Sequence, residues 1–168
     1  MNAELQEQLA KEFTFMKRKP LKDPKRIDDL YGAYGIETGN GWYAILHKLC
    51  TNISQELNAA GIDNQSIVID QIKEKYGTLR FYYHFEGDDI GIHAFDCITP
   101  SGIESLRIKS KGECYKDRIA ELVSECEDLS GKTCEMCGSD AVLRTDLGWI
   151  RTLCNTCYQG VITRMKKE

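Results

Sequence analysis

Apolar residues recur at three- and four-residue intervals in three stretches of the chain, and each stretch predicts an amphipathic helix. The first covers residues 3–16. The second begins near Asn40, whose side chain suits a helix N-cap, and stops before Gly61. The third covers residues 103–129, with Gly112 as a point where it could divide into two helices. The apolar positions of the second and clearest helix are Trp42, Ile45, Leu46, Leu49, Cys50, Ile53 and Leu57.

The middle of the chain is rich in β-branched and aromatic residues, which is the composition of β-strands. A break at Tyr76-Gly77 divides it into two expected antiparallel strands, about residues 66–74 and 78–86. A further short strand is expected at residues 90–95.

Residues 27–41 contain four glycines and are expected to form turns. This run precedes a helix, as a phosphate-binding loop does, but it lacks the Lys-Ser/Thr ending and follows no clear strand. The predicted elements together indicate an α+β fold in which helices flank a small antiparallel sheet.

Four of the eight cysteines form two C-x-x-C pairs near the end of the chain. Cys134 and Cys137 are separated by sixteen residues from Cys154 and Cys157. Each pair brings two sulfurs to one ion from a tight turn, and four thiolates complete the tetrahedral shell that zinc prefers. The spacing falls in the zinc-ribbon range. We therefore predict one structural Zn²⁺ in a C-terminal four-cysteine ribbon; a catalytic zinc is disfavoured because such sites keep an open position.

Disulfides and redox-active dithiols are the alternatives for these pairs. No apolar secretion signal is present at the N-terminus, and the cytosol keeps thiols reduced. A redox dithiol normally lies between a strand and a helix of a βαβ unit, and neither pair is expected there. Four thiolates would leave a local charge of about −2, which Lys132, Arg144 and Arg151 could offset.

The net charge of −4 is unevenly distributed. Residues 17–26 carry +5, residues 27–129 carry −9 and residues 130–168 carry +2. The acidic middle argues against a broad nucleic-acid surface, since phosphate contacts need clustered Lys and Arg. The basic ends keep a nucleic-acid or acidic-protein partner open, although a solvated linker is the default interpretation of residues 17–26.

Basic residues also alternate with aromatic residues in the second expected strand, which could stack and neutralise a single-stranded nucleic acid. The same alternation is what a half-buried sheet requires, and that interpretation is favoured. The tail adds Arg164, Lys166 and Lys167. The candidate partner-binding residues are Lys17, Arg18, Lys19, Lys22, Lys25, Arg26, Lys73, Lys75, Arg80, Arg144 and Arg151.

Two weaker constellations involve histidine. His47 and Cys50 lie three residues apart on the clearest helix, but Cys50 continues its apolar stripe, so packing is favoured over catalysis. His93 and Cys97, with His84, offer only three ligands of undefined geometry for a second metal. The sequence assigns no role to Cys50, Cys97, Cys114 or Cys126.

The length and composition of the chain indicate its core size, its location and its division into parts. A chain of 168 residues can bury a core without relying wholly on a metal. No stretch reaches the roughly 18 apolar residues of a membrane span, so we expect a cytoplasmic protein. We predict three parts: an N-terminal helix and basic segment (1–26), an α+β core (27–130), and the zinc ribbon with its basic tail (131–168).

Three segments together resemble a group of small phage and bacterial proteins: GNGWYAILHKLC, IDQIKEKYGTLRFYY, and CEMCGSDAVLR followed by GWIRTLC. The resemblance covers roughly residues 39–158, and KEKYGTLRFY and GWIRTLC are its most specific parts. Related sequences often end the second pair with His where this chain has Cys157, and either residue can bind zinc. The resemblance implies a prokaryotic or phage setting, in the host cytoplasm if phage-encoded, and supplies no catalytic residues.

The sequence favours a non-enzymatic protein-interaction module that binds zinc. By the resemblance alone, its natural version is a phage-encoded adaptor or inhibitor of a host protein, including a defence system. The alternative is a zinc-ribbon protein that binds nucleic acid. An enzyme or small-ligand protein that uses His47, His84 or His93 also stays open, although no nucleophile–base pair is recognisable.

Overall fold

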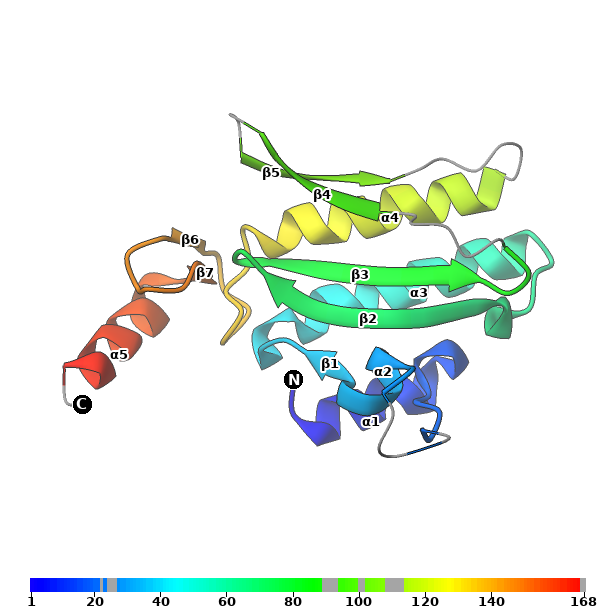
Figure 1. Cartoon of the computed structure of the whole chain (residues 1–168), viewed down its shortest axis with the longest axis horizontal. Coiled ribbons are helices and arrows are strands. Elements are labelled where there is room, and N and C mark those ends of the chain that lie inside the picture. The colour runs from blue at the N-terminus through cyan, green and yellow to red at the C-terminus, as the bar shows by residue number, and fades with distance from the viewer. Residues whose placement is uncertain (22, 24–26, 89–93, 100–101, 108–113, 167–168) are drawn as a thin grey trace.

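The computed structural model describes residues 1–21, 23, 27–88, 94–99, 102–107 and 114–166, with only the backbone for 94–99 and 102–107. Its elements follow one another along the chain as shown in Figure 1. They are α1 (Ala3–Glu12), the 3₁₀ turn η1 (Thr14–Met16), α2 (Leu30–Tyr34), β1 (Ile36–Glu37), η2 (Asn40–Trp42), α3 (Tyr43–Ala59), η3 (Asn64–Ser66), β2 (Ile67–Lys75), β3 (Thr78–Phe85), β4 (Ala94–Thr99), β5 (Gly102–Arg107), α4 (Cys114–Ser130), β6 (Val142–Arg144), β7 (Arg151–Leu153) and α5 (Asn155–Met165).

The central sheet has the order β1-β2-β3. β2 and β3 pair antiparallel through a tight turn at Tyr76 and Gly77, both of which have positive φ. This confirms the predicted hairpin and the α+β class. β1 pairs parallel with β2, through Ile36 opposite Ile72, so the sheet is mixed rather than purely antiparallel. Strand β1 lies within residues 27–41, where only turns were expected. A strand of two residues is too short for a hydrophobic period to be detected in the sequence.

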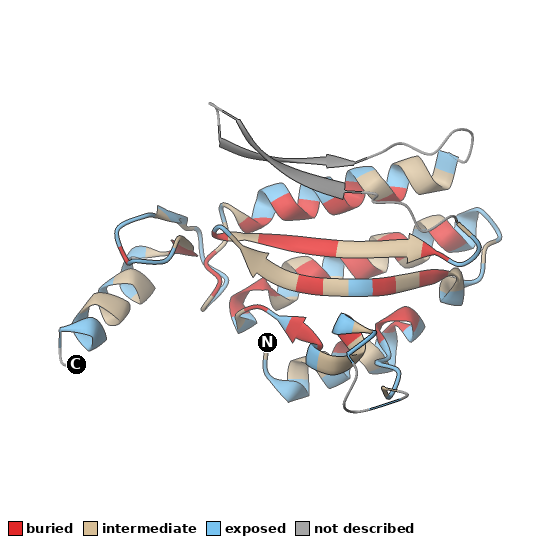
Figure 2. Ribbon diagram, in the orientation of Figure 1, coloured by how far each residue is buried: buried red, intermediate tan, exposed pale blue. Residues whose placement is uncertain are grey.

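The hydrophobic core lies between one face of this sheet and the helices (Figure 2). On β3, Phe81 and Phe85 are buried, as the favoured half-buried sheet requires. The N-terminal residues Leu9, Phe13 and Met16 belong to the same core cluster. The N-terminal helix therefore packs with the α+β core, while the three-part division of the chain stays a prediction.

One element prediction was wrong in part. Of the helix expected over residues 103–129, the part from Cys114 is confirmed as α4, whereas residues 102–107 form β5 and pair antiparallel with β4. Residues 108–113 lie outside the described chain. Such a short apolar run does not distinguish a helix from a strand by its periodicity. The strand expected at 90–95 overlaps β4 at residues 94 and 95, and residues 90–93 lie outside the described chain. Helix α5 was not predicted.

Side chains of α1 and α4, together with the N-terminal amine, bind groups at both edges of the central sheet. At the β1 edge, the Ile36 amide donates to Gln6 Oε1 (2.9 Å) and the Met1 amine donates to the Ile36 carbonyl (2.9 Å). At the β3 edge, the Leu79 amide donates to Ser130 Oγ (2.7 Å) and the Phe81 amide donates to Glu127 Oε1 (2.9 Å).

The buried carboxylate of Glu127 should therefore be needed for stability. We expect Glu127→Ala to lower the free energy of unfolding by about 2–3 kcal/mol, because it leaves the buried Phe81 amide without its charged acceptor. Glu127→Gln keeps an acceptor oxygen and should lose less. Glu125→Ala, at an exposed position of the same helix, is the control and should stay within about 0.5 kcal/mol of wild type in urea denaturation. An equal loss of unfolding free energy in Glu127→Ala and Glu125→Ala would contradict a stabilising contact between Glu127 and the β3 edge.

Candidate metal centre

The four predicted ligands converge in space. The Sγ atoms of Cys134, Cys137, Cys154 and Cys157 all lie within 4.8 Å of one another, and Cys137 Sγ is 3.6 Å from Cys154 Sγ. A tetrahedral shell with Zn–S bonds of about 2.3 Å places sulfurs about 3.8 Å apart. The donor set and its spacing therefore fit a divalent metal with a preference for thiolates.

The first pair is held by a tight backbone loop. The Cys134 amide donates to the Ser139 carbonyl (2.7 Å), and the Gly138 amide donates to the Cys134 carbonyl (2.8 Å). Gly138 has φ +81°, which a residue with a side chain rarely adopts. This turn therefore requires a glycine at position 138 for conformational reasons.

The second pair stands where β7 meets α5. Cys154 is the N-cap of α5, and its sulfur accepts a hydrogen bond from the Cys157 amide (3.4 Å). This corrects the expectation that neither pair lies between a strand and a helix. However, β7 pairs antiparallel with β6, so this cysteine pair does not belong to a βαβ unit. The positive end of the helix dipole lies at these sulfurs.

The thiols influence one another's ionisation. Hydrogen bonds from Ser139 lower the pKa of Cys137 to about 6. Loss of solvation and hydrogen bonds with the other three thiols raise the pKa of Cys157. A divalent metal would supply the charge that keeps all four sulfurs deprotonated.

The loop of the first pair is fixed to the core by the segment Gly39–Trp42. The Gly41 amide donates to the Glu135 carbonyl (2.8 Å), and Trp42 Nε1 donates to the Thr133 carbonyl (2.7 Å). A β-carbon on Gly41 would lie 2.1 Å from the Cys134 carbonyl oxygen. These residues hold the cysteine loop in place, whereas the sequence indicated only a turn and a helix start for them.

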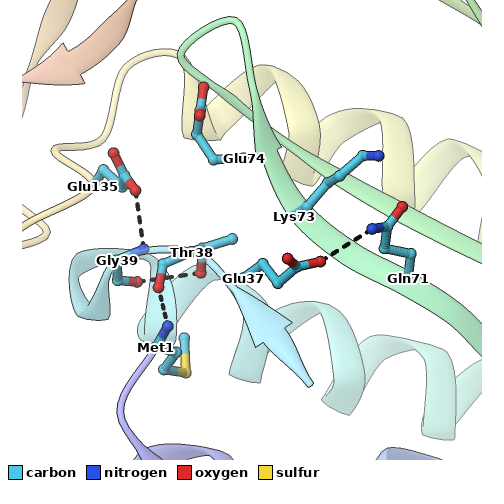
Figure 3. A pocket seen from close by; sticks show the side chains of 8 residues that line it. All are labelled: Met1, Glu37, Thr38, Gly39, Gln71, Lys73, Glu74 and Glu135. Carbon is cyan, nitrogen blue, oxygen red and sulfur yellow. Dashed lines mark hydrogen bonds between the residues drawn. The ribbon is translucent and has the colours of Figure 1, made fainter. Parts of the chain in front are cut away.

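A polar cleft of about 670 Å³ opens beside this loop (Figure 3). Its carboxylates accept hydrogen bonds from neighbouring groups, as Glu135 does from the Gly39 amide and Glu37 from Gln71 Nε2. Partial burial lowers the pKa of the Met1 amine, which also donates to the Thr38 carbonyl. Several polar groups that line the cleft thus bind one another, and we assign no ligand to the cleft. Its lining residues are Met1, Glu37, Thr38, Gly39, Gln71, Lys73, Glu74 and Glu135.

The arginines expected near the thiolates have other partners. Arg151 pairs with Glu135 at 3.2 Å. The Arg144 guanidinium lies 4.3 Å from the centre of the Tyr158 ring and donates to Asn155 Oδ1 (2.5 Å). In the described part of the chain, neither guanidinium bonds to a cysteine sulfur.

The remaining candidate basic residues are dispersed. Arg18 donates to the carbonyls of Gly32 and Ala33, and Arg80 is buried and donates to Thr78 Oγ1 and the Leu79 carbonyl. Lys73 and Lys75 lie on β2, and their ammonium groups lie over the Tyr82 and Tyr76 rings. The exposed Lys17, Lys19, Lys132, Arg164 and Lys166 belong to the two ends of the chain. Outside the described residues are Lys22, Lys25, Arg26 and Lys167.

The histidine constellations are not assembled in the described residues. His47 pairs with Glu12 at 2.7 Å, while Cys50 is fully buried and its pKa is raised by burial. His84 pairs with Asp70 at 2.9 Å. His93 and the side chain of Cys97 lie outside the description. Of the other thiols, Cys126 is buried, which raises its pKa to about 12, and Cys114 is exposed.

Comparison of the chain with protein-family models, curated proteins and solved structures finds no match. Within the described residues, no helix is long and apolar enough to cross a membrane.

Proposed function

We propose that this protein is a non-enzymatic interaction module in which one structural Zn²⁺ stabilises the ribbon. The four-thiolate donor set supports zinc over magnesium or calcium, which prefer oxygen ligands. A full shell of four cysteines leaves no open position for a substrate, and this supports a structural role.

The main support for an interaction role is Trp149, whose side chain is 65% exposed to solvent yet held in place. Its Nε1 donates to Glu74 Oε2 (3.0 Å), and Glu74 Oε1 accepts the Gly77 amide. Tyr76 and Leu143 are also exposed beside this turn, and a β-carbon on Gly77 would meet Leu143 Cδ1. Preorganised aromatic residues on a protein surface are the usual anchors of protein interfaces.

Nucleic-acid binding is the less favoured alternative. Its strongest ligands would be arginines, but Arg18, Arg80, Arg144 and Arg151 already bind groups within the molecule. The resemblance described above suggests a bacterial host for the partner. On that basis, we propose an adaptor or inhibitor of a host protein, with defence systems among the targets.

Partner retention tests this proposal. We expect a partner protein that co-purifies with wild type from a bacterial lysate to be lost, by about tenfold or more, from Trp149→Ala, because truncating an aromatic anchor costs about 2 kcal/mol or more. Val142→Ala, which shortens an exposed apolar side chain elsewhere on the ribbon, is the control. Native mass spectrometry would quantify both complexes and their zinc. Co-purifying nucleic acid that dissociates at high salt would instead favour the alternative.

A further inference from the structure

The four sulfurs of the metal centre differ in their access to solvent. Cys137 is exposed, Cys154 and Cys157 are half-buried, and Cys134 is fully buried. In a site that serves stability alone, shielding every sulfur would be sufficient. Here one ligand lies where a small oxidant can reach it, while the others lie behind it.

The exposed sulfur has a neighbour from the other cysteine pair. Cys137 Sγ and Cys154 Sγ are 3.6 Å apart, and they are joined by chain that runs through β6 and β7. A bond between them would therefore link the loop of the first pair to the start of α5. We propose that Cys137 is a site of oxidation by hydroperoxides and that Cys154 resolves it as a disulfide. This inference rests on the proposed metal centre.

The chemistry balances with hydrogen peroxide as the oxidant. The Cys137 thiolate attacks one peroxide oxygen, so an S–O bond forms and the O–O bond breaks, and the departing hydroxide takes a proton to become water. The Cys154 thiolate then attacks the Cys137 sulfur, so the S–S bond forms and the S–O bond breaks. A second hydroxide leaves and is protonated. The two sulfurs give up two electrons, and the peroxide becomes two waters.

Loss of two of the four ligands would release the metal and alter the ribbon. The first loop stays attached to the core through Gly41 and Trp42. By contrast, no residue of α5 is fully buried, and Cys154 is its N-cap. Oxidation should therefore change the end of the molecule that carries Trp149 and leave the core intact.

The test uses zinc-loaded Cys114→Ser protein, in which the other exposed thiol of the described chain is removed. Hydrogen peroxide is added, zinc release is followed with a chromogenic chelator, and disulfides are mapped by peptide mass spectrometry. We expect a Cys137–Cys154 disulfide to form in step with zinc release, while Cys50 and Cys126 stay reduced. A disulfide within either C-x-x-C pair, oxidation without a disulfide, or retention of zinc would overturn the inference.

Matched variants separate Cys137 from the other ligands. Histidine also binds zinc, so Cys137→His should keep the metal but release it about tenfold more slowly than the parent under peroxide. Cys157→His also exchanges one ligand, but it keeps Cys137 and Cys154 and should respond like the parent. Equal rates for the two variants would contradict the assignment. Should the purified protein hold no metal, the proposed function fails, and disulfide mapping of that protein still decides the pairing.

Discussion

Replacing Cys134 with Ser should remove the zinc and unfold the ribbon while the core stays folded. Among the described residues, the buried members of the ribbon's apolar cluster are Cys134, Leu147 and Leu153, and a cluster of this size is too small to order the ribbon without metal. Structural zinc supplies about 10–16 kcal/mol of binding free energy in zinc-finger peptides, so its loss should dominate the stability of this part. Metal analysis and amide hydrogen exchange measure the two effects.

The exposed Cys114 provides the control for this experiment. Cys114→Ser should keep zinc and leave exchange in the ribbon unchanged, because Cys114 begins α4 and is not a ligand. Full zinc occupancy and unchanged protease resistance in Cys134→Ser would refute the four-cysteine centre.

A single methyl group at Gly41 should damage both the core and the metal centre. The added β-carbon would lie 2.1 Å from the Cys134 carbonyl oxygen and 2.5 Å from the Gly138 amide nitrogen. Both are backbone atoms of the cysteine loop, so relief requires the loop to move off the core. We expect Gly41→Ala to lower stability by about 3 kcal/mol and the melting temperature by roughly 10 °C, with weaker zinc binding.

Gly160 offers the matched control. A β-carbon there has no neighbour within 4 Å, and the residue lies inside α5. Gly160→Ala should therefore be neutral or stabilise by up to about 1 kcal/mol through helix propensity. Thermal unfolding of both variants with zinc present makes the comparison. If Gly41→Ala lowers the melting temperature no more than Gly160→Ala does, the cysteine loop does not pack closely on Gly41.

Local signals explain which features the sequence could predict. The β2–β3 hairpin has composition, alternation and a turn within twenty residues, and the cysteine spacing alone indicates one four-ligand site. The contacts between Gly41 and Cys134 and between Glu127 and Phe81 join residues far apart in the chain. Nothing in a local pattern reports such pairs. The glycine in GNGW was visible, but turn geometry and close backbone approach look the same in a sequence.

The roles of the arginines could not be predicted from the sequence. Arg18, Arg80, Arg144 and Arg151 all seemed available for a partner in the sequence. In the structure, each donates to a carbonyl, hydroxyl, amide oxygen or carboxylate of its own chain. Counting charge cannot separate a surface that binds phosphate from side chains that brace loops, because both uses need the same guanidinium.

The contacts at the sheet edges also limit how this protein can meet other chains. Exposed strand edges are templates on which foreign strands add, both in peptide recognition and in aggregation. Gln6 and Met1 at β1, and Glu127 and Ser130 at β3, bind the groups that such a strand would need. A strand added at these positions would have to displace the side chains, and a variant that frees the β3 edge should be prone to self-association.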